Sequence, residues 1–136
     1  MDAGEAVVYL RGEAERDLQE AETYIESFSK DGAVKVLDKL CREIYQLARN
    51  LRRNKAIPEN IPANLQICYN NLNDLSGDAR RKIEPSLSAA AKKAVQGKLL
   101  RDLITLTKKI RTVESLLVQL EKEGQRKPND RQRMSA

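Results

Sequence analysis

The sequence predicts an all-α fold, an antiparallel bundle of four main helices, from three observations. Apolar residues recur at steps of three and four through four long segments, which places them on one helix face in each segment. Aromatic residues make up only 4% of the chain and Trp is absent, whereas β-rich domains draw on aromatic and β-branched side chains. The connections between the segments are short, which favours antiparallel neighbours.

The first predicted helix spans about residues 5–28. Its apolar positions lie on one face. They are Val7, Leu10, Ala14, Leu18, Ala21, Ile25 and Phe28. Gly12 costs about 1 kcal/mol relative to Ala, so we expect the helix to fray or begin later there. Residues 29–32 break the helix, and Ser29 or Asp31 is suited to cap the next one.

Two further helices are predicted over residues 32–53 and 62–75, on either side of a loop with two prolines. Pro58 biases the residue before it away from helix, and Pro62 suits a first helical turn. The third helix is rich in Asn, a poor helix former, so we expect packing against its neighbours to hold it. The inward positions of the two helices are Leu37, Leu40, Cys41, Ile44, Leu47, Ala48, Leu51, Leu65, Cys68, Leu72 and Leu75.

The longest predicted helix runs from about residue 86 to residue 123, with Gly124 as its stop signal. Before it we expect a turn at residues 76–78 and a short helix over residues 79–84. Its apolar ladder alternates steps of four and three, as in a coiled coil. The ladder is Leu99, Leu103, Leu106, Ile110, Val113, Leu117 and Leu120. Leu100, Ile104 and Leu116 widen it, which favours burial in a bundle over a two-stranded coiled coil.

We expect one domain over residues 1–123 and a disordered, basic tail over residues 124–136, which contains Pro128. Breaks near Pro85 and Gly97 leave five or six shorter helices as the alternative to four. No apolar run approaches the length of about 18 residues that a membrane span needs, and the acidic N-terminus is unlike a signal peptide. The sequence therefore predicts an intracellular protein of the cytoplasm or nucleus.

The chain contains no His, which excludes several kinds of site. His is the usual general base near neutral pH and the commonest metal ligand, so Ser-His-Asp catalysis and mixed Cys/His zinc sites are ruled out. Cys41 and Cys68 lack a metal-ligand spacing and fall on apolar stripes. We expect two buried free thiols, with a disulfide or a reactive thiol as the alternative. We therefore predict no enzyme activity, no cofactor, and no catalytic or metal-binding residue.

Charge is spread unevenly along the chain. Residues 1–31 contain three Lys and Arg against nine Asp and Glu, a net charge of −6, whereas residues 32–123 contain eighteen against ten, a net charge of +8. Either the acidic first helix lies against the basic faces and screens them, or an exposed basic surface meets an acidic partner or nucleic acid. The candidate partner-binding residues form four groups: Arg49, Arg52, Arg53 and Lys55; Arg80, Arg81 and Lys82; Lys92 and Lys93; Lys108, Lys109 and Arg111.

Surplus apolar residues occur at residues 7–10, 56–61 and 116–118. Such residues can mark a groove for a partner helix or a contact between copies of the chain, although packing at helix ends explains them equally well.

The predicted function is a non-catalytic protein–protein interaction module, an adaptor or scaffold, in a larger intracellular assembly. Its partner would be a helix or an acidic segment in an apolar groove rimmed by the basic groups. Against nucleic-acid binding, the tyrosines are scattered over three helices, and Pro85 interrupts a helix-turn-helix drawn over residues 75–91. The partner and the choice between monomer and homodimer stay open. The alternative is a nucleic-acid-binding domain that uses the basic groups at residues 49–55, 80–82, 92–93 and 108–111.

Overall fold

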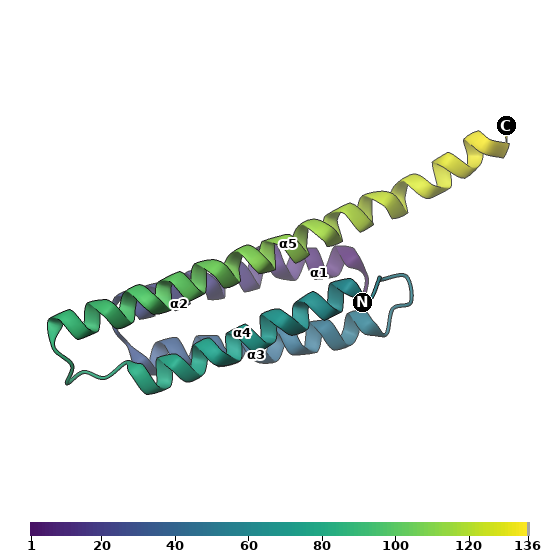
Figure 1. Cartoon of the computed structure of the whole chain (residues 1–136). Helices are drawn as coiled ribbons and strands as arrows, with labels where there is room; N and C mark the ends of the chain where they lie inside the picture. The colour runs from purple at the N-terminus through teal and green to yellow at the C-terminus, as the bar shows by residue number, and fades with distance from the viewer. Residues whose placement is uncertain (136) are drawn as a thin grey trace.

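The chain folds into a bundle of four antiparallel helices, with no strand among residues 1–135 (Figure 1). The structure is a computed structural model that describes the backbone of residues 1–135 and the side chains of residues 1–124. The prediction of an all-α antiparallel bundle is confirmed. The first helix has three consecutive parts, and the elements in chain order are α1 (Ala3–Tyr9), the π-helical η1 (Leu10–Ala14), α2 (Glu15–Glu26), α3 (Lys30–Arg52), α4 (Asn60–Lys82) and α5 (Ala89–Ser135).

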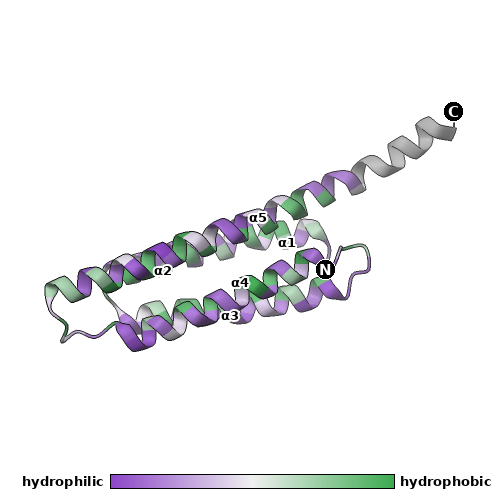
Figure 2. Ribbon diagram, viewed as in Figure 1, coloured by the Kyte–Doolittle hydropathy of each residue, from purple (hydrophilic) through white to green (hydrophobic). Residues whose placement is uncertain are grey.

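Each helix packs against the helix before it, and α5 closes the bundle by contacting both α4 and the first helix. The apolar stripes of all four helices meet in one core. Figure 2 shows hydrophobic and hydrophilic residues interspersed along every helix, which is the pattern of amphipathic helices. In α5 the ladder is buried from Leu99 to Leu117, and Leu120 is half-buried. The predicted ladder therefore faces the other helices.

The first helix begins at Ala3, earlier than predicted, because Asp2 caps it. The Oδ1 atom of Asp2 accepts a hydrogen bond from the backbone N–H of Glu5 at 2.8 Å. Gly12 does not fray the helix but lies within η1, where the backbone takes a wider π-helical turn. The predicted apolar stripe stays buried on both sides of this turn.

The first helix ends two residues before Phe28, which the sequence placed on its apolar stripe. Phe28 has a φ of 56°, in the left-handed region that favours glycine. It completes a Schellman motif, in which Ser29 N–H donates to the Tyr24 carbonyl at 2.8 Å and Phe28 N–H donates to the Ile25 carbonyl at 3.0 Å. The Phe28 ring packs against the core, and the Lys92 ammonium lies 5.7 Å from its centroid. These contacts offset the backbone strain.

Gly32 permits the close packing of α2 on α3, and its replacement is a test of that packing. A Cβ atom at Gly32 would clash with the ring of Tyr24, because it would lie 2.7 Å from Cγ and closer still to Cδ1. We expect Gly32→Ala to lower the free energy of unfolding by about 1 kcal/mol or more, against the gain in helix propensity, because the Tyr24 ring must leave its place. Urea denaturation measures the change.

The matched control for Gly32 is Gly12, which has no atom within 4 Å of the added Cβ. Gly12→Ala should be neutral or should stabilise by up to about 1 kcal/mol. If both substitutions stabilise the protein equally, the packing of Tyr24 on Gly32 contributes nothing.

One helix, α4, replaces the predicted third helix, turn and short helix. Residues 76–78 are helical because Ser76 and Ala79 continue the inward stripe and are buried. Burial of this stripe outweighs the turn preference of the Ser-Gly-Asp segment. The helix-turn-helix drawn over residues 75–91 is therefore wrong, since no turn interrupts α4 there.

The last helix runs through Gly97, as in the main prediction, but it differs from the prediction at Gly124. The break near Pro85 is confirmed, because residues 83–88 connect α4 to α5, but Gly97 lies inside α5 and does not break it. The helix also continues through Gly124, so its predicted end there is wrong. The predicted disordered tail falls mainly on residues 125–136, whose side chains are outside the described part, and it stays a prediction.

Candidate interaction surfaces

The four predicted basic groups do not form one surface. Residues 49–55 lie where α3 joins α4, and residues 80–82 lie at the other end of α4, a helix roughly 34 Å long. Residues 92–93 share that second end, while residues 108–111 lie farther along α5. The structure therefore brings two of the four groups to the same end of the bundle and separates the others.

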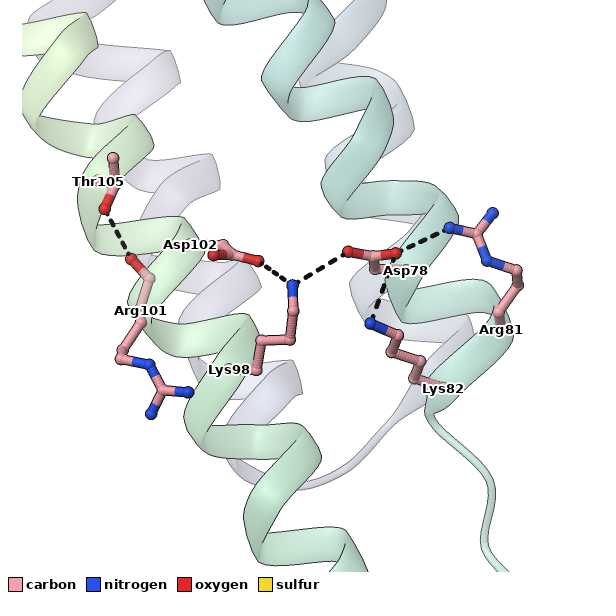
Figure 3. Close-up of polar contacts among 7 residues, drawn as sticks. All are labelled: Asp78, Arg81, Lys82, Lys98, Arg101, Asp102 and Thr105. Atoms are coloured by element: carbon pink, nitrogen blue, oxygen red, sulfur yellow. Dashed lines mark hydrogen bonds and ion pairs between the residues drawn. The ribbon is translucent and has the colours of Figure 1, made fainter.

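One predicted basic group is held in an ion network between α4 and α5. Figure 3 shows Asp78 of α4 beside Arg81 at 2.8 Å and Lys82 at 3.9 Å. Lys98 of α5 lies 3.5 Å from Asp78 and 2.8 Å from Asp102, so the network joins the two helices. Partial burial alone would raise the pKa of Asp78, but hydrogen bonds and charge from these cations lower it below its usual range.

Other predicted cations have acidic neighbours on adjacent turns or helices. Arg80 lies 2.8 Å from Asp38, and Arg52 lies 3.1 Å from Glu59. The buried Ser76 hydroxyl donates to the second oxygen of Asp38 at 2.5 Å. Within residues 1–124, no ion pair is found for Arg49, Arg53, Lys55, Lys92, Lys93, Lys108 and Lys109.

The acidic first helix screens only part of the basic surface. Glu15 lies 3.4 Å from Arg111, the one predicted cation that pairs with this helix among the described residues. The other ion pairs between the first helix and its neighbours involve cations that the sequence analysis did not select. Arg11 lies 2.6 Å from Glu114 of α5, and Asp17 binds Lys39 of α3. Most of the predicted cations therefore remain accessible.

A polar cluster joins the first helix to α3 beside η1. Nζ of Lys39 lies 3.1 Å from Oδ2 of Asp17, and it reaches Glu43 at 3.7 Å and Glu13 at 3.9 Å. The Tyr9 hydroxyl is buried nearby and forms no hydrogen bond within the described residues. Burial, and then the charge of Glu43, raises the pKa of Tyr9 far above its usual value. One lysine thus balances three carboxylates at this junction.

Both cysteines are free and buried, as predicted. Burial raises the pKa of Cys41 and of Cys68 to about 11, which disfavours the reactive thiolate. Among the side chains described, no group of three or more His, Cys, Asp or Glu is placed to hold a metal ion. None of the described helices is long and apolar enough to cross a membrane.

The core accounts for most of the predicted surplus apolar residues. Ile57 and Ile61 of the proline loop are buried, so of the two alternatives that the sequence left open there, packing is the correct one. At residues 7–10 only Val8 is clearly exposed, and at residues 116–118 the central leucine is buried. Leftover apolar surface is found elsewhere on the bundle.

A groove with an apolar floor runs between α2 and α5. Leu18 of α2 and Leu103 of α5 form its buried floor. Leu100 is half-buried, and Ile104 is 55% exposed on the wall. Leu100 and Ile104 were both predicted to widen the buried stripe of this helix, and the prediction is wrong for Ile104. The groove follows α5 over residues 100–111, about 17 Å or three helical turns.

The two rims of the α2–α5 groove carry opposite charge. Glu15 and Glu22 line it from α2, whereas Lys108 and Arg111 line it from α5. The Glu15–Arg111 pair joins the rims at one end. A bound segment would therefore meet an acidic edge on one side and a basic edge on the other.

A second surface on the α3–α4 face escaped the sequence analysis. The rings of Tyr45 on α3 and Tyr69 on α4 pack with centroids 5.3 Å apart and an interplanar angle of 51°. Although scattered in sequence, these two tyrosines meet because α3 and α4 form a hairpin. Tyr45 is exposed, and Arg42 and Arg49 lie about one turn from it on either side.

No family model matches the chain, and no curated protein or solved structure shows significant similarity to it.

Proposed function

We propose that the protein is a non-catalytic interaction module, an adaptor or scaffold, that binds an amphipathic helix of a partner protein in the α2–α5 groove. The observation that carries this proposal is the exposure of Ile104, which is 55% exposed beside the half-buried Leu100 in a groove with charged rims. A large apolar side chain in an open groove is a typical anchor for a partner helix.

The dimensions and charges of the groove support a helical occupant. Three turns of helix match its length along α5, and one apolar row of the partner would cover Leu100 and Ile104. Basic residues on one flank of that helix would face Glu15 and Glu22 of α2, and acidic residues on the other flank would face Lys108 of α5.

We also propose an intracellular location, in the cytoplasm or nucleus, because two free cysteines suit a reducing compartment. The nucleic-acid alternative has less support from the basic groups first considered, since they lie on separate parts of the bundle.

The decisive variant is Ile104→Glu, compared with Ile67→Glu on α4. Ile67 is a matched control because it is 48% exposed but lies outside the groove. A protein captured from nuclease-treated lysate should bind the wild type and Ile67→Glu, and it should bind Ile104→Glu at least roughly tenfold more weakly. Equal effects of the two substitutions, or loss of the partner on nuclease treatment, would contradict the proposal.

A photo-crosslinking residue locates the partner. At position 108, on the groove rim, it should crosslink the captured protein, whereas at position 109, in the α4–α5 seam, it should not. Light scattering measures the oligomeric state and so tests whether a second copy of the chain occupies the groove. If the protein self-associates and Ile104→Glu abolishes this self-association, the groove is a homodimer contact and not a site for a partner helix.

A further inference from the structure

We infer that the α3–α4 face binds single-stranded nucleic acid, with phosphates along α3 and a base stacked on Tyr45. This face lies opposite the α2–α5 groove. Around the bundle α3 has α2 and α4 as its neighbours, and α5 packs against the same two helices. The inference is thus independent of the proposed partner helix. Both surfaces are available at once, so the protein can join a protein partner to a nucleic acid.

A row of cations on α3 suits a phosphate backbone. Lys35, Arg42 and Arg49 follow one another at steps of seven residues, which places them on one helix face about 10 Å apart. All three are exposed, and none pairs with an acid within residues 1–124. Unpaired cations gain most from phosphates, since binding releases the counterions of the nucleic acid.

The tyrosine pair supplies a stacking platform beside this row. Tyr45 lies between Arg42 and Arg49 on the surface, and its ring is held at 5.3 Å from the half-buried ring of Tyr69. A supported, exposed aromatic ring between two arginines is a common arrangement for binding unpaired bases. Duplex bases are already stacked on each other, so the arrangement favours a single strand.

Acidic charge on this face is partly neutralised within the protein. Asp38, a carboxylate of α3 that contacts α4, is paired with Arg80 and accepts a hydrogen bond from Ser76. Gln66 and Asn73 lie about one turn from Tyr69 on either side and offer amide groups to a stacked base. Asp31, one turn before Lys35, and Asp74, which lines the same hollow as Asp38 and Asn73, are exposed. The face therefore presents cations, one platform and neutral polar groups, with some acidic charge at its edges.

The experiment measures fluorescence anisotropy of labelled oligothymidylate, of its oligouridylate counterpart and of a duplex, each about 20 nucleotides long, against the full chain at several salt concentrations. Single strands should bind more tightly than the duplex. Arg42→Gln with Arg49→Gln should weaken single-strand binding roughly tenfold and reduce the salt slope by about 1.4. Tyr45→Leu, which keeps an apolar contact with Tyr69, should weaken it roughly 5- to 100-fold.

The matched control is Arg101→Gln with Lys108→Gln on α5. These two cations are also exposed and also seven residues apart, but they lie away from the α3–α4 face. The control pair should change the affinity for the single strand by less than about threefold, and Ile104→Glu should leave this affinity unchanged. Circular dichroism verifies that each variant keeps its helical content.

Four outcomes of the binding measurements would overturn the inference. They are no binding at low salt, equal losses in the two double variants, unchanged affinity in Tyr45→Leu, and binding of polyglutamate but not of the oligonucleotide. The last outcome would assign the row of cations to an acidic protein segment. With 3-fluorotyrosine in place of the four tyrosines, the oligonucleotide should shift the fluorine resonance of Tyr45 most. A shift confined to Tyr9 or Tyr24 would also contradict the assignment.

Discussion

Leu106→Asp should unfold the domain at neutral pH or lower its stability by roughly 4 kcal/mol or more. Leu106 is 2% exposed in the middle of the α5 ladder, so the new carboxylate would be ionised in the core without a partner. Loss of the leucine volume adds a cavity cost of about 2–5 kcal/mol. Since a domain of this size is stable by about 5–15 kcal/mol, the combined effect approaches complete unfolding.

Thermal circular dichroism measures the effect of Leu106→Asp, with Ile104→Asp as control. Ile104 lies two residues earlier on the same helix but is 55% exposed, so an acid there should cost only about 0.5 kcal/mol. The melting transition of Leu106→Asp should vanish or fall by more than roughly 12 °C. Superimposable melting curves for the two variants would mean that the α5 ladder does not face the core.

Lys39→Met should lower the stability by roughly 2 kcal/mol, which is a fall of roughly 6–10 °C in the melting temperature. Asp17 is only 5% exposed at its side chain, and Lys39 is its ion-pair partner. Without Lys39, the carboxylates of Asp17, Glu43 and Glu13 face one another. The expected loss is smaller than for a fully buried pair because Lys39 itself is 43% exposed.

The control for Lys39→Met is Lys35→Met, one turn earlier on α3, which removes an exposed lysine without an ion pair in the described part of the chain. Adding Asp17→Asn to Lys39→Met should recover part of the lost stability, because it removes the buried charge. If Lys35→Met and Lys39→Met are equally stable, the ion pairs of Lys39 beside η1 contribute nothing to the stability of the fold.

The loss in Lys39→Met should also depend on pH. Burial raises the pKa of Glu43 in the wild type, and the opposing charge of Lys39 limits this rise. A carboxyl group with a raised folded pKa destabilises the fold when ionised, so the penalty is absent below its unfolded pKa and complete above its folded pKa. The difference from the wild type should therefore shrink as the pH falls from 7 toward 4.

The fold could be predicted largely because apolar periodicity and burial agree. The α5 ladder and the stripes of the other three helices appear in the structure as expected. Errors occurred where local preference and burial disagree. Ser-Gly-Asp at residues 76–78 favours a turn by itself, but burial of Ser76 and Ala79 keeps α4 continuous. At Phe28 the apolar side chain predicted a further helical residue, but the backbone takes a left-handed turn there. The side chain contacts the core from this turn.

The candidate surfaces were less predictable, because they combine residues that are distant in sequence. Grouping neighbouring cations found Arg49 but missed Lys35 and Arg42, although the steps of seven residues were visible in the sequence. The contact of Tyr45 with Tyr69 depends on the register of the α3–α4 hairpin, which no single-helix pattern specifies. The exposure of Ile104 likewise depends on how far α2 covers α5.

The π-helical turn η1 divides the first helix into two α-helical segments, α1 and α2. The turn sets how one segment is rotated about the helix axis relative to the other. A π turn contains about one residue more than an α turn, so η1 absorbs a residue that a regular helix could not accommodate. Loss of one residue between Leu10 and Ala14 would leave an ordinary α-helical turn, with α1 and α2 still directed at the core. The same loss elsewhere in this helix would rotate one segment by about 100° and point its apolar side chains into water.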